Sequence, residues 1–229
     1  ANKPYAEFQA QLDVPSFLAG TPPYTTWGGA IQVVDGAPRL ERIERVCIAA
    51  AVPKGAPPED GWPTVIFAHD LGGHYRSAMV HGIADVLTNL GWAVVGFDHA
   101  LHGTRFNETK NPTENDIVEK FYDLERPDMM RDLALQGVAD LTAVARFLKD
   151  GELSSATQNI RFNKEKLVLL GHGFGGEVGV PFMAYSDATA AGILIDPGAS
   201  MTTMARELES PVRLRDQLMV ELGDLDLEE

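Results

Sequence analysis

The sequence predicts an α/β fold, a mostly parallel, doubly wound sheet with helices on both faces. Short apolar runs alternate along the chain with segments of helical periodicity, the pattern of right-handed β-α-β units. These runs are apolar at nearly every position, as in strands buried on both faces. The run at residues 167–170 (LVLL) leads directly into a cluster of glycines, which favours a sharp turn from a strand into a helix.

The elements follow in order from these patterns and from the residues that interrupt them. We expect strands at residues 45–52, 64–68, 92–97, 167–170 and 191–195, and helices at residues 77–90, 130–148 and 175–185. Pro53 ends the first strand because proline cannot donate to a sheet. Gly91 and Gly151 end the first two helices.

The remaining segments are expected to surround this core. Residues 1–40 are rich in proline, glycine and aromatic residues and are predicted to form an extended segment laid over the sheet. Residues 98–128 form a long polar loop, a length typical of lids and binding loops. Residues 201–229 resemble a helical tail or partial lid, broken at Pro211. We interpret residues 1–229 as a single domain.

Composition limits the classes of function. The 229 residues are 45% hydrophobic and 23% charged, as in one soluble globular domain. A net charge of -14 and a pI near 4.8 argue against nucleic acid and anionic membranes as partners, because both repel an acidic surface. No apolar run has the length of a transmembrane helix. Cys47 is the only cysteine, so no intrachain disulfide can form, and we interpret Cys47 as a core residue.

The glycine cluster has the frame of a nucleophile elbow, G-x-S-x-G, at residues 171–175. In this motif a strained turn presents the central side chain above the sheet as a nucleophile. Here the central residue is Gly173, so the nucleophile position is vacant. The motif therefore predicts the turn and argues against serine chemistry.

Titratable residues gather where the predicted strands end, which is where open α/β sheets bind their ligands. These residues are His69, Asp70, His74, Asp98, His99, His102 and His172. Histidines in such loops usually hold the backbone by hydrogen bonds, and we interpret His69 and His102 in this way. We expect His172 to pack against or bond a neighbouring loop. Imidazoles and carboxylates converge there, as they do in metal sites, but no compact ligand pair is visible. We expect no metal and no cofactor.

Four runs together carry a resemblance to a known family. They are GWPTVIFAHDLGG, GWAVVGFDHALHGTR, MRDLALQGVADL and GHGFGG, in an order that resembles the bacterial secreted lipases and esterases of the α/β-hydrolase superfamily. The resemblance covers residues 61–198. It implies the α/β-hydrolase fold, a small-molecule ester or acyl substrate and an extracytoplasmic location. It also implies that the backbone N–H groups of Leu71 and Phe174 form the oxyanion hole.

The sequence departs from the family pattern in three places. Gly173 replaces the serine, and Asp70 replaces a glycine, which puts a carboxylate where negative charge would develop in a substrate. No histidine follows His172 to act as base, although Asp196 stands where some members place the acid. About 33 residues follow the strand at 191–195, so we expect a C-terminally incomplete version of the fold.

Two functions follow from this pattern. The first is a relative of carboxylic-ester hydrolases that is inactive as written, because nucleophile and base are both absent. The second is a non-catalytic module that binds an apolar or acyl ligand in the same pocket.

Overall fold

The computed structural model describes residues 3–24, 26–106, 112–123, 125–154 and 159–198. The helical tail expected at residues 201–229 lies outside this part of the chain. Within the described residues, no helix combines the length and the apolar character needed to cross a bilayer.

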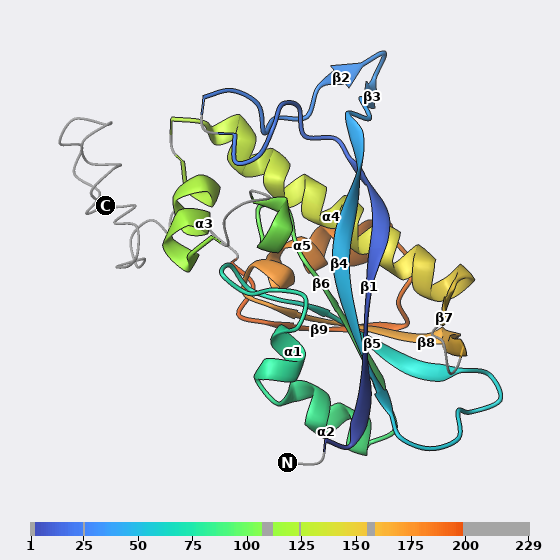
Figure 1. Ribbon diagram of the computed structural model, residues 1–229. Coiled ribbons are helices and arrows are strands. Elements are labelled where there is room, and N and C mark those ends of the chain that lie inside the picture. The colour runs from blue at the N-terminus through green and yellow to red at the C-terminus, as the bar shows by residue number, and fades with distance from the viewer. Residues whose placement is uncertain (1–2, 25, 107–111, 124, 155–158, 199–229) are drawn as a thin grey trace, which may run out of the picture.

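A mixed sheet of seven strands forms the centre of the described structure (Figure 1). Its main path, from one side to the other, is β1 (Tyr5–Ser16), β4 (Arg42–Pro53), β6 (Ala93–Phe97), β5 (Trp62–Ala68), β8 (Asn159–His172) and β9 (Ala191–Ile195). Strands β6, β5, β8 and β9 are parallel to one another, whereas β1 and β4 run antiparallel to their neighbours. The short β7 (Glu152–Ser154) pairs with the beginning of β8. A separate hairpin joins β2 (Val33–Val34) to β3 (Ala37–Pro38).

Helices cover both faces of the sheet, as the apolar runs predicted. Figure 1 shows α1 (Ser77–Val80) and α2 (Ile83–Asn89) on one side of β8 and β9, and α4 (Pro127–Asp150) and α5 (Phe174–Tyr185) on the other. Alternate residues of β4 enter two separate cores, with Ile48 and Ala50 facing α4 and α5 and Ala49 and Ala51 facing α1 and α2. This alternation follows from the two-residue period of a strand. The predicted α/β fold class is therefore confirmed.

Three segments differ from expectation. The N-terminal segment was expected to lie over the sheet, but β1 joins it by pairing along the whole of β4. The helix expected at residues 77–90 is divided into α1 and α2, because Gly82 adopts a φ of 77° between them. The loop expected at residues 98–128 contains a short 3₁₀ helix, η1 (Gly103–Arg105), and α3 (Glu114–Phe121).

Threonine and aspartate explain why α3 forms in a polar stretch. The Thr113 side chain accepts from the N–H of Asp116, and the Asp116 carboxylate accepts from the N–H of Thr113. This reciprocal capping box satisfies two backbone donors that a helix start would otherwise leave unpaired.

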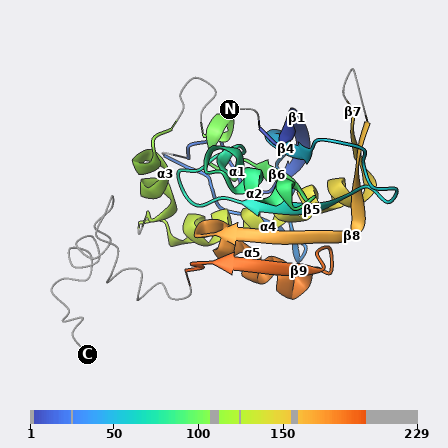
Figure 2. The same ribbon diagram turned by 90° about the horizontal axis from the view of Figure 1, so that it is seen from below.

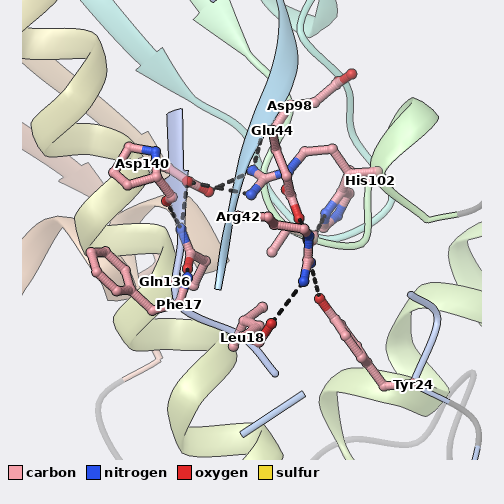
Figure 3. Close-up of polar contacts among 12 residues, drawn as sticks. Phe17, Leu18, Tyr24, Arg42, Glu44, Asp98, His102, Gln136 and Asp140 are labelled. Atoms are coloured by element: carbon pink, nitrogen blue, oxygen red, sulfur yellow. Dashed lines mark hydrogen bonds and ion pairs between the residues drawn. The ribbon is translucent and has the colours of Figure 1, made fainter. Parts of the chain in front are cut away.

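A buried ion network fixes the loop after β6 to the helix layer (Figure 3). The Arg105 guanidinium donates to Asp140 Oδ2 at 2.5 Å, to Glu44 Oε2 at 2.9 Å and to the Asp98 carbonyl at 3.0 Å. Arg42 extends the network from Glu44 to Tyr24. Burial alone would lower the pKa of Arg105, but Asp140 and Glu44 hold it above its usual value, so Arg105 is charged. The network ties η1 to β4 and α4.

Candidate functional site

The turn between β8 and α5 has the geometry of a nucleophile elbow. β8 ends at His172 and α5 begins at Phe174, so Gly173 alone forms the turn. Its backbone adopts φ 52° and ψ -118°, a combination that strains residues with a side chain. Its N–H donates to the Ile195 carbonyl at 2.9 Å, and its carbonyl accepts from the Glu177 N–H.

The flanking glycines let this turn lie close to the sheet. A Cβ atom on Gly175 would lie 2.1 Å from the Ala68 carbonyl oxygen of β5, and one on Gly171 would lie 2.4 Å from the Gly175 carbonyl oxygen. Neither separation is possible for real atoms, so both positions require glycine. The start of α5 is thereby held against the end of β5, where the loop with Asp70 begins.

Two backbone N–H groups from different loops meet at a single oxygen of Asp70. The N–H of Leu71 and the N–H of Phe174 each donate to Asp70 Oδ1 at 2.8 Å. Phe174 is the first residue of α5, and the start of a helix favours negative charge. These are the two donors that the family resemblance implied, and in this chain they bind its own carboxylate.

The Asp70 side chain also occupies the space of a side chain at position 173. A Cβ atom built on Gly173 would lie 2.1 Å from both Cγ and Oδ1 of Asp70, and 2.4 Å from Oδ2. The carboxylate therefore accepts from both N–H groups and fills the space that a side chain at position 173 would need. Asp70 and Gly173 are compatible only as a pair.

Two further acidic groups surround Asp70, and sequence reasoning missed both. Burial and then the charge of Asp70 raise the pKa of Glu177, in the first turn of α5. Burial, followed by the charges of Glu177 and Asp70, raises the pKa of Tyr122. The position of Glu177, four residues after Gly173 on the predicted helix, was the signal that could have identified it. Tyr122 lay in the segment predicted to be a loop.

Three buried histidines lie together at the ends of β5 and β6. The ring centroids of His69 and His99 are 4.6 Å apart, and those of His69 and His102 are 4.9 Å apart. Burial lowers the pKa of His69 to about 4 and lowers the pKa values of His99 and His102 well below 6.5. All three are therefore neutral near pH 7.

Two of these histidines form hydrogen bonds to the loop backbone, contacts that fit a structural role. His69 Nδ1 donates to the Asp70 carbonyl at 2.7 Å. His102 Nδ1 donates to the Ala100 carbonyl at 2.8 Å, which leaves Nε2 to accept from the Gly72 N–H at 3.2 Å. His102 thus connects the loop after β6 to the loop that carries Asp70 and Leu71.

Of the other predicted site residues, Asp98 bonds the loop that follows β5, whereas His172 and Asp196 lie on the surface. Asp98 Oδ1 accepts from the Tyr75 N–H at 2.7 Å, and burial raises the Asp98 pKa to about 6. His172 is exposed on β8. Asp196 is exposed directly after β9, and in the described residues neither it nor His172 makes a side-chain hydrogen bond. Across those same residues no group of three or more histidine, cysteine or acidic side chains could hold a metal ion.

Comparison with known proteins identifies the fold. No protein-family model matches the sequence, and no curated protein matches it significantly. Among solved structures, an esterase from an Arctic intertidal metagenomic library is 14% identical with a TM-score of 0.50, over 84% of this chain and 61% of the other. An acetyl xylan esterase from Paenibacillus sp. R4 is 12% identical with a TM-score of 0.50, over 96% of this chain and 63% of the other.

A further similar structure belongs to a Klebsiella pneumoniae protein assigned as a dienelactone hydrolase. It is 16% identical with a TM-score of 0.50, over 85% of this chain and 62% of that chain. The present chain thus spans about three fifths of the length of these similar structures. At sequence identities this low, the similarity shows only that the backbones share a fold. The chain has the α/β-hydrolase fold.

Proposed function

We propose that this chain is a relative of carboxylic-ester hydrolases of the secreted lipase and esterase type that does not turn over esters. One observation carries the proposal: the N–H groups of Leu71 and Phe174 converge at 2.8 Å on one oxygen beside a nucleophile elbow. Paired N–H donors in this position stabilise the oxyanion of acyl transfer. Small-molecule esters as ancestral substrates and an extracytoplasmic location are part of the proposal.

The loss of ester hydrolysis has two causes in the same site. Gly173 has no side chain to attack an acyl carbon, and serine chemistry further requires a neighbouring base. In addition, the Asp70 carboxylate occupies the two N–H donors, so an ester carbonyl cannot reach them without displacing it. A Gly173→Ser change alone would supply no base, and its Cβ would lie 2.1 Å from Cγ of Asp70, so this variant is expected to remain inactive.

The second candidate is a non-catalytic module that binds an apolar or acyl ligand. It would place the ligand beside Phe121 and Phe174, which pack against each other in the core with ring centroids 4.7 Å apart, next to the two N–H donors. An acyl ligand would have to displace the Asp70 carboxylate from those donors. An Asp70→Ala variant should then bind decanoate more tightly than the unchanged chain, measured by titration calorimetry.

A steady-state assay with p-nitrophenyl acetate tests the leading proposal. We expect hydrolysis at the rate of buffer alone for the unchanged chain and for Gly173→Ser, and no labelling of Gly173→Ser by a fluorophosphonate. Turnover above the buffer rate that disappears in Asp70→Asn would contradict the proposal. Labelling of Gly173→Ser would also contradict it, since one of the histidines would then be acting as a base.

A further inference from the structure

A cavity of about 460 Å³ lies between β4, the end of β6 and the loop that precedes α1. These three segments lie side by side (Figure 1 and Figure 2). The residues that line the cavity include Cys47 of β4, Tyr75 before α1 and Asp98 after β6. Its volume falls in the range of small-molecule pockets, about 300–1,000 Å³.

The cavity is separate from the elbow at Gly173. Cys47 lies on the same face of β4 as Ala49 and Ala51, which pack against α1 and α2, because strand side chains alternate between faces. Asp98 lies opposite Cys47, and its N–H donates to the Cys47 carbonyl at 3.2 Å. Opposite residues of an antiparallel pair share a face. The cavity therefore lies on the face of the sheet away from α5.

One carboxylate oxygen of Asp98 has no partner. Asp98 is 1% exposed, and its Oδ1 accepts from the Tyr75 N–H at 2.7 Å. Its Oδ2 has no hydrogen-bond partner within the described residues. This oxygen lies against the bare backbone of Gly103, another residue of the cavity wall, since a Cβ added there would lie 2.3 Å from it. A buried carboxylate is costly unless it is paired, so the position favours a donor supplied by a ligand.

The cationic side chains near Asp98 bond elsewhere. Arg105 donates to the backbone carbonyl of Asp98 at 3.0 Å, and its other bonds go to the two buried acids of the ion network. Arg76 donates to Glu7 at 2.5 Å. His74 lines the cavity, but burial and then the charge of Arg76 lower its pKa, so it is neutral near pH 7. Across the described part of the chain, no cation bonds the Asp98 carboxylate.

We propose that this cavity binds a small primary amine, whose ammonium group donates to Oδ2 of Asp98. An ammonium group supplies both the missing donor and the opposite charge, and charge-assisted hydrogen bonds are about twice as strong as neutral ones. The net charge of -14 also attracts cations and repels anions. The site goes beyond the function proposed above and involves neither Asp70 nor an ester.

The other walls of the cavity fit an amine with a short aromatic body. Ile117 of α3 contributes an apolar wall and Tyr75 an aromatic ring, and aromatic faces attract ammonium groups. Thr104 lines the same cavity and is exposed, whereas Asp98 is buried. The cavity thus leads from the surface to the carboxylate. Phenethylamine combines an ammonium group with an aromatic ring and is a suitable probe.

Titration calorimetry with three ligands that share a phenyl group tests the proposal on the unchanged chain. Phenethylamine is cationic, phenethyl alcohol is neutral and hydrocinnamate is anionic. At about pH 7.5 a primary amine is protonated, as lysine is, and Asp98, with a pKa of about 6, is mostly ionised. We expect the amine to bind at one site per chain, the alcohol to bind at least about tenfold more weakly, and the anion not to bind measurably.

Cys47 reports where the amine binds. It is the only cysteine of the chain, and it lines the cavity while half-buried. Iodoacetamide should alkylate Cys47 in the unliganded chain, as measured by peptide mass spectrometry. Phenethylamine at about ten times its Kd should slow this alkylation about tenfold, whereas hydrocinnamate at the same concentration and ionic strength should not. These measurements need no variant.

Two matched variants identify the acceptor. Asp98→Asn keeps the shape and an oxygen for the Tyr75 N–H, but it removes the charge and turns a donor toward the ammonium group. Its affinity for phenethylamine should fall at least about tenfold. Asp60→Asn removes the same charge from an exposed position and should keep the affinity of the unchanged chain. Circular dichroism establishes that both variants are folded.

The inference is overturned if phenethylamine does not bind, if the amine and the alcohol bind equally, or if a folded Asp98→Asn variant keeps its affinity for the amine. It is also overturned if bound amine leaves the alkylation of Cys47 unchanged. A Cys47 that does not react in the unliganded chain would overturn it as well, because the cavity would then be closed to small molecules. None of these results bears on the p-nitrophenyl acetate assay, so the two proposals fail independently.

Discussion

Asp70 and Gly173 depend on each other, although they are about one hundred positions apart in the chain. The Asp70 carboxylate needs the space that a side chain at 173 would occupy, and the elbow backbone at 173 tolerates a side chain poorly. The same carboxylate satisfies the N–H groups of Leu71 and Phe174, which would otherwise require water or a ligand. The effect on stability of a substitution at either residue should therefore depend on which residue occupies the other position.

We predict that Gly173→Ala destabilises the chain more than a glycine substitution that adds strain alone. Gly36→Ala is the matched control, because Gly36 also has a positive φ, 78°, but nothing lies within 4 Å of an added Cβ. The strain at each position should cost about 1–3 kcal/mol, and the contact with Asp70 adds to it only at position 173. Urea unfolding measures both losses.

A double-mutant cycle with Asp70→Ala isolates that contact. In the Asp70→Ala background the extra cost of Gly173→Ala should disappear, giving a coupling of about 0.5–3 kcal/mol. Additive losses in the cycle would mean that the carboxylate moves aside without cost. The two residues would then not be a mutually dependent pair.

The sequence could predict the vacant elbow, because the G-x-G-x-G spacing and the preceding apolar run are local features. It also predicted that Asp70 conflicts with an oxyanion hole. It could not predict that both N–H groups bind the Asp70 side chain itself, since that depends on the distance between two loops. Glu177 and Tyr122 were missed for the same reason, because their pKa shifts arise from burial and from Asp70 in three dimensions.

At the scale of elements, the short buried strands and α5 were predicted closely, whereas the beginning of β8 and the helix at residues 77–90 were not. Apolar runs marked β5, β6 and β9 to within two residues of their ends, because a buried strand is apolar throughout. The helix at residues 77–90 was wrong, since its pattern spans a glycine that takes a left-handed conformation. Val86 and Leu90, two apolar residues of this segment, are 62% and 70% exposed.

The β1 strand was missed because its partner is distant in sequence. Its residues alternate between the core and solvent, and it pairs with β4 across the segment that includes the β2–β3 hairpin. The ion network that ties η1 to β4 and α4 was also not foreseen. Its members Arg105, Glu44 and Asp140 lie in η1, β4 and α4, so their contacts depend on how these three elements pack.

We predict that Arg105→Met strongly destabilises the fold. The side chains of Arg105 and Asp140 are 3% and 0% exposed, and removing one partner of a buried pair leaves an uncompensated charge, at a cost of about 3–5 kcal/mol. The control is Arg39→Met, because the Arg39 side chain pairs with Glu41 while 49% exposed, and such pairs contribute about 0–1 kcal/mol. Thermal unfolding followed by circular dichroism compares the two. Equal losses would show that the network does not hold the loop.

At the scale of the whole molecule, burial of three neutral histidines links stability to pH. In the unfolded chain these imidazoles bind protons near pH 6.5, whereas burial keeps them neutral in the folded chain to a lower pH. The unfolded state therefore binds more protons below pH 6.5, and folding stability falls as pH falls. Asp98 acts in the opposite sense, because burial raises its pKa to about 6 and its protonation favours the folded state at low pH.

The histidine contribution can be isolated with His99→Phe. His99 is fully buried between aromatic rings, with centroids 4.7 Å from Phe97 and 5.2 Å from Phe174, and neither ring nitrogen has a hydrogen-bond partner within the described residues. Phenylalanine should therefore fit the site and remove one proton from the difference between the two states. We predict that the loss of unfolding free energy between pH 6.5 and pH 5 becomes smaller by about 1.4 kcal/mol per pH unit.

The exposed His81→Phe variant should keep the original dependence, and urea titrations of all three proteins at several pH values provide the measurement. An unchanged dependence in His99→Phe would mean that His99 is protonated in the folded chain.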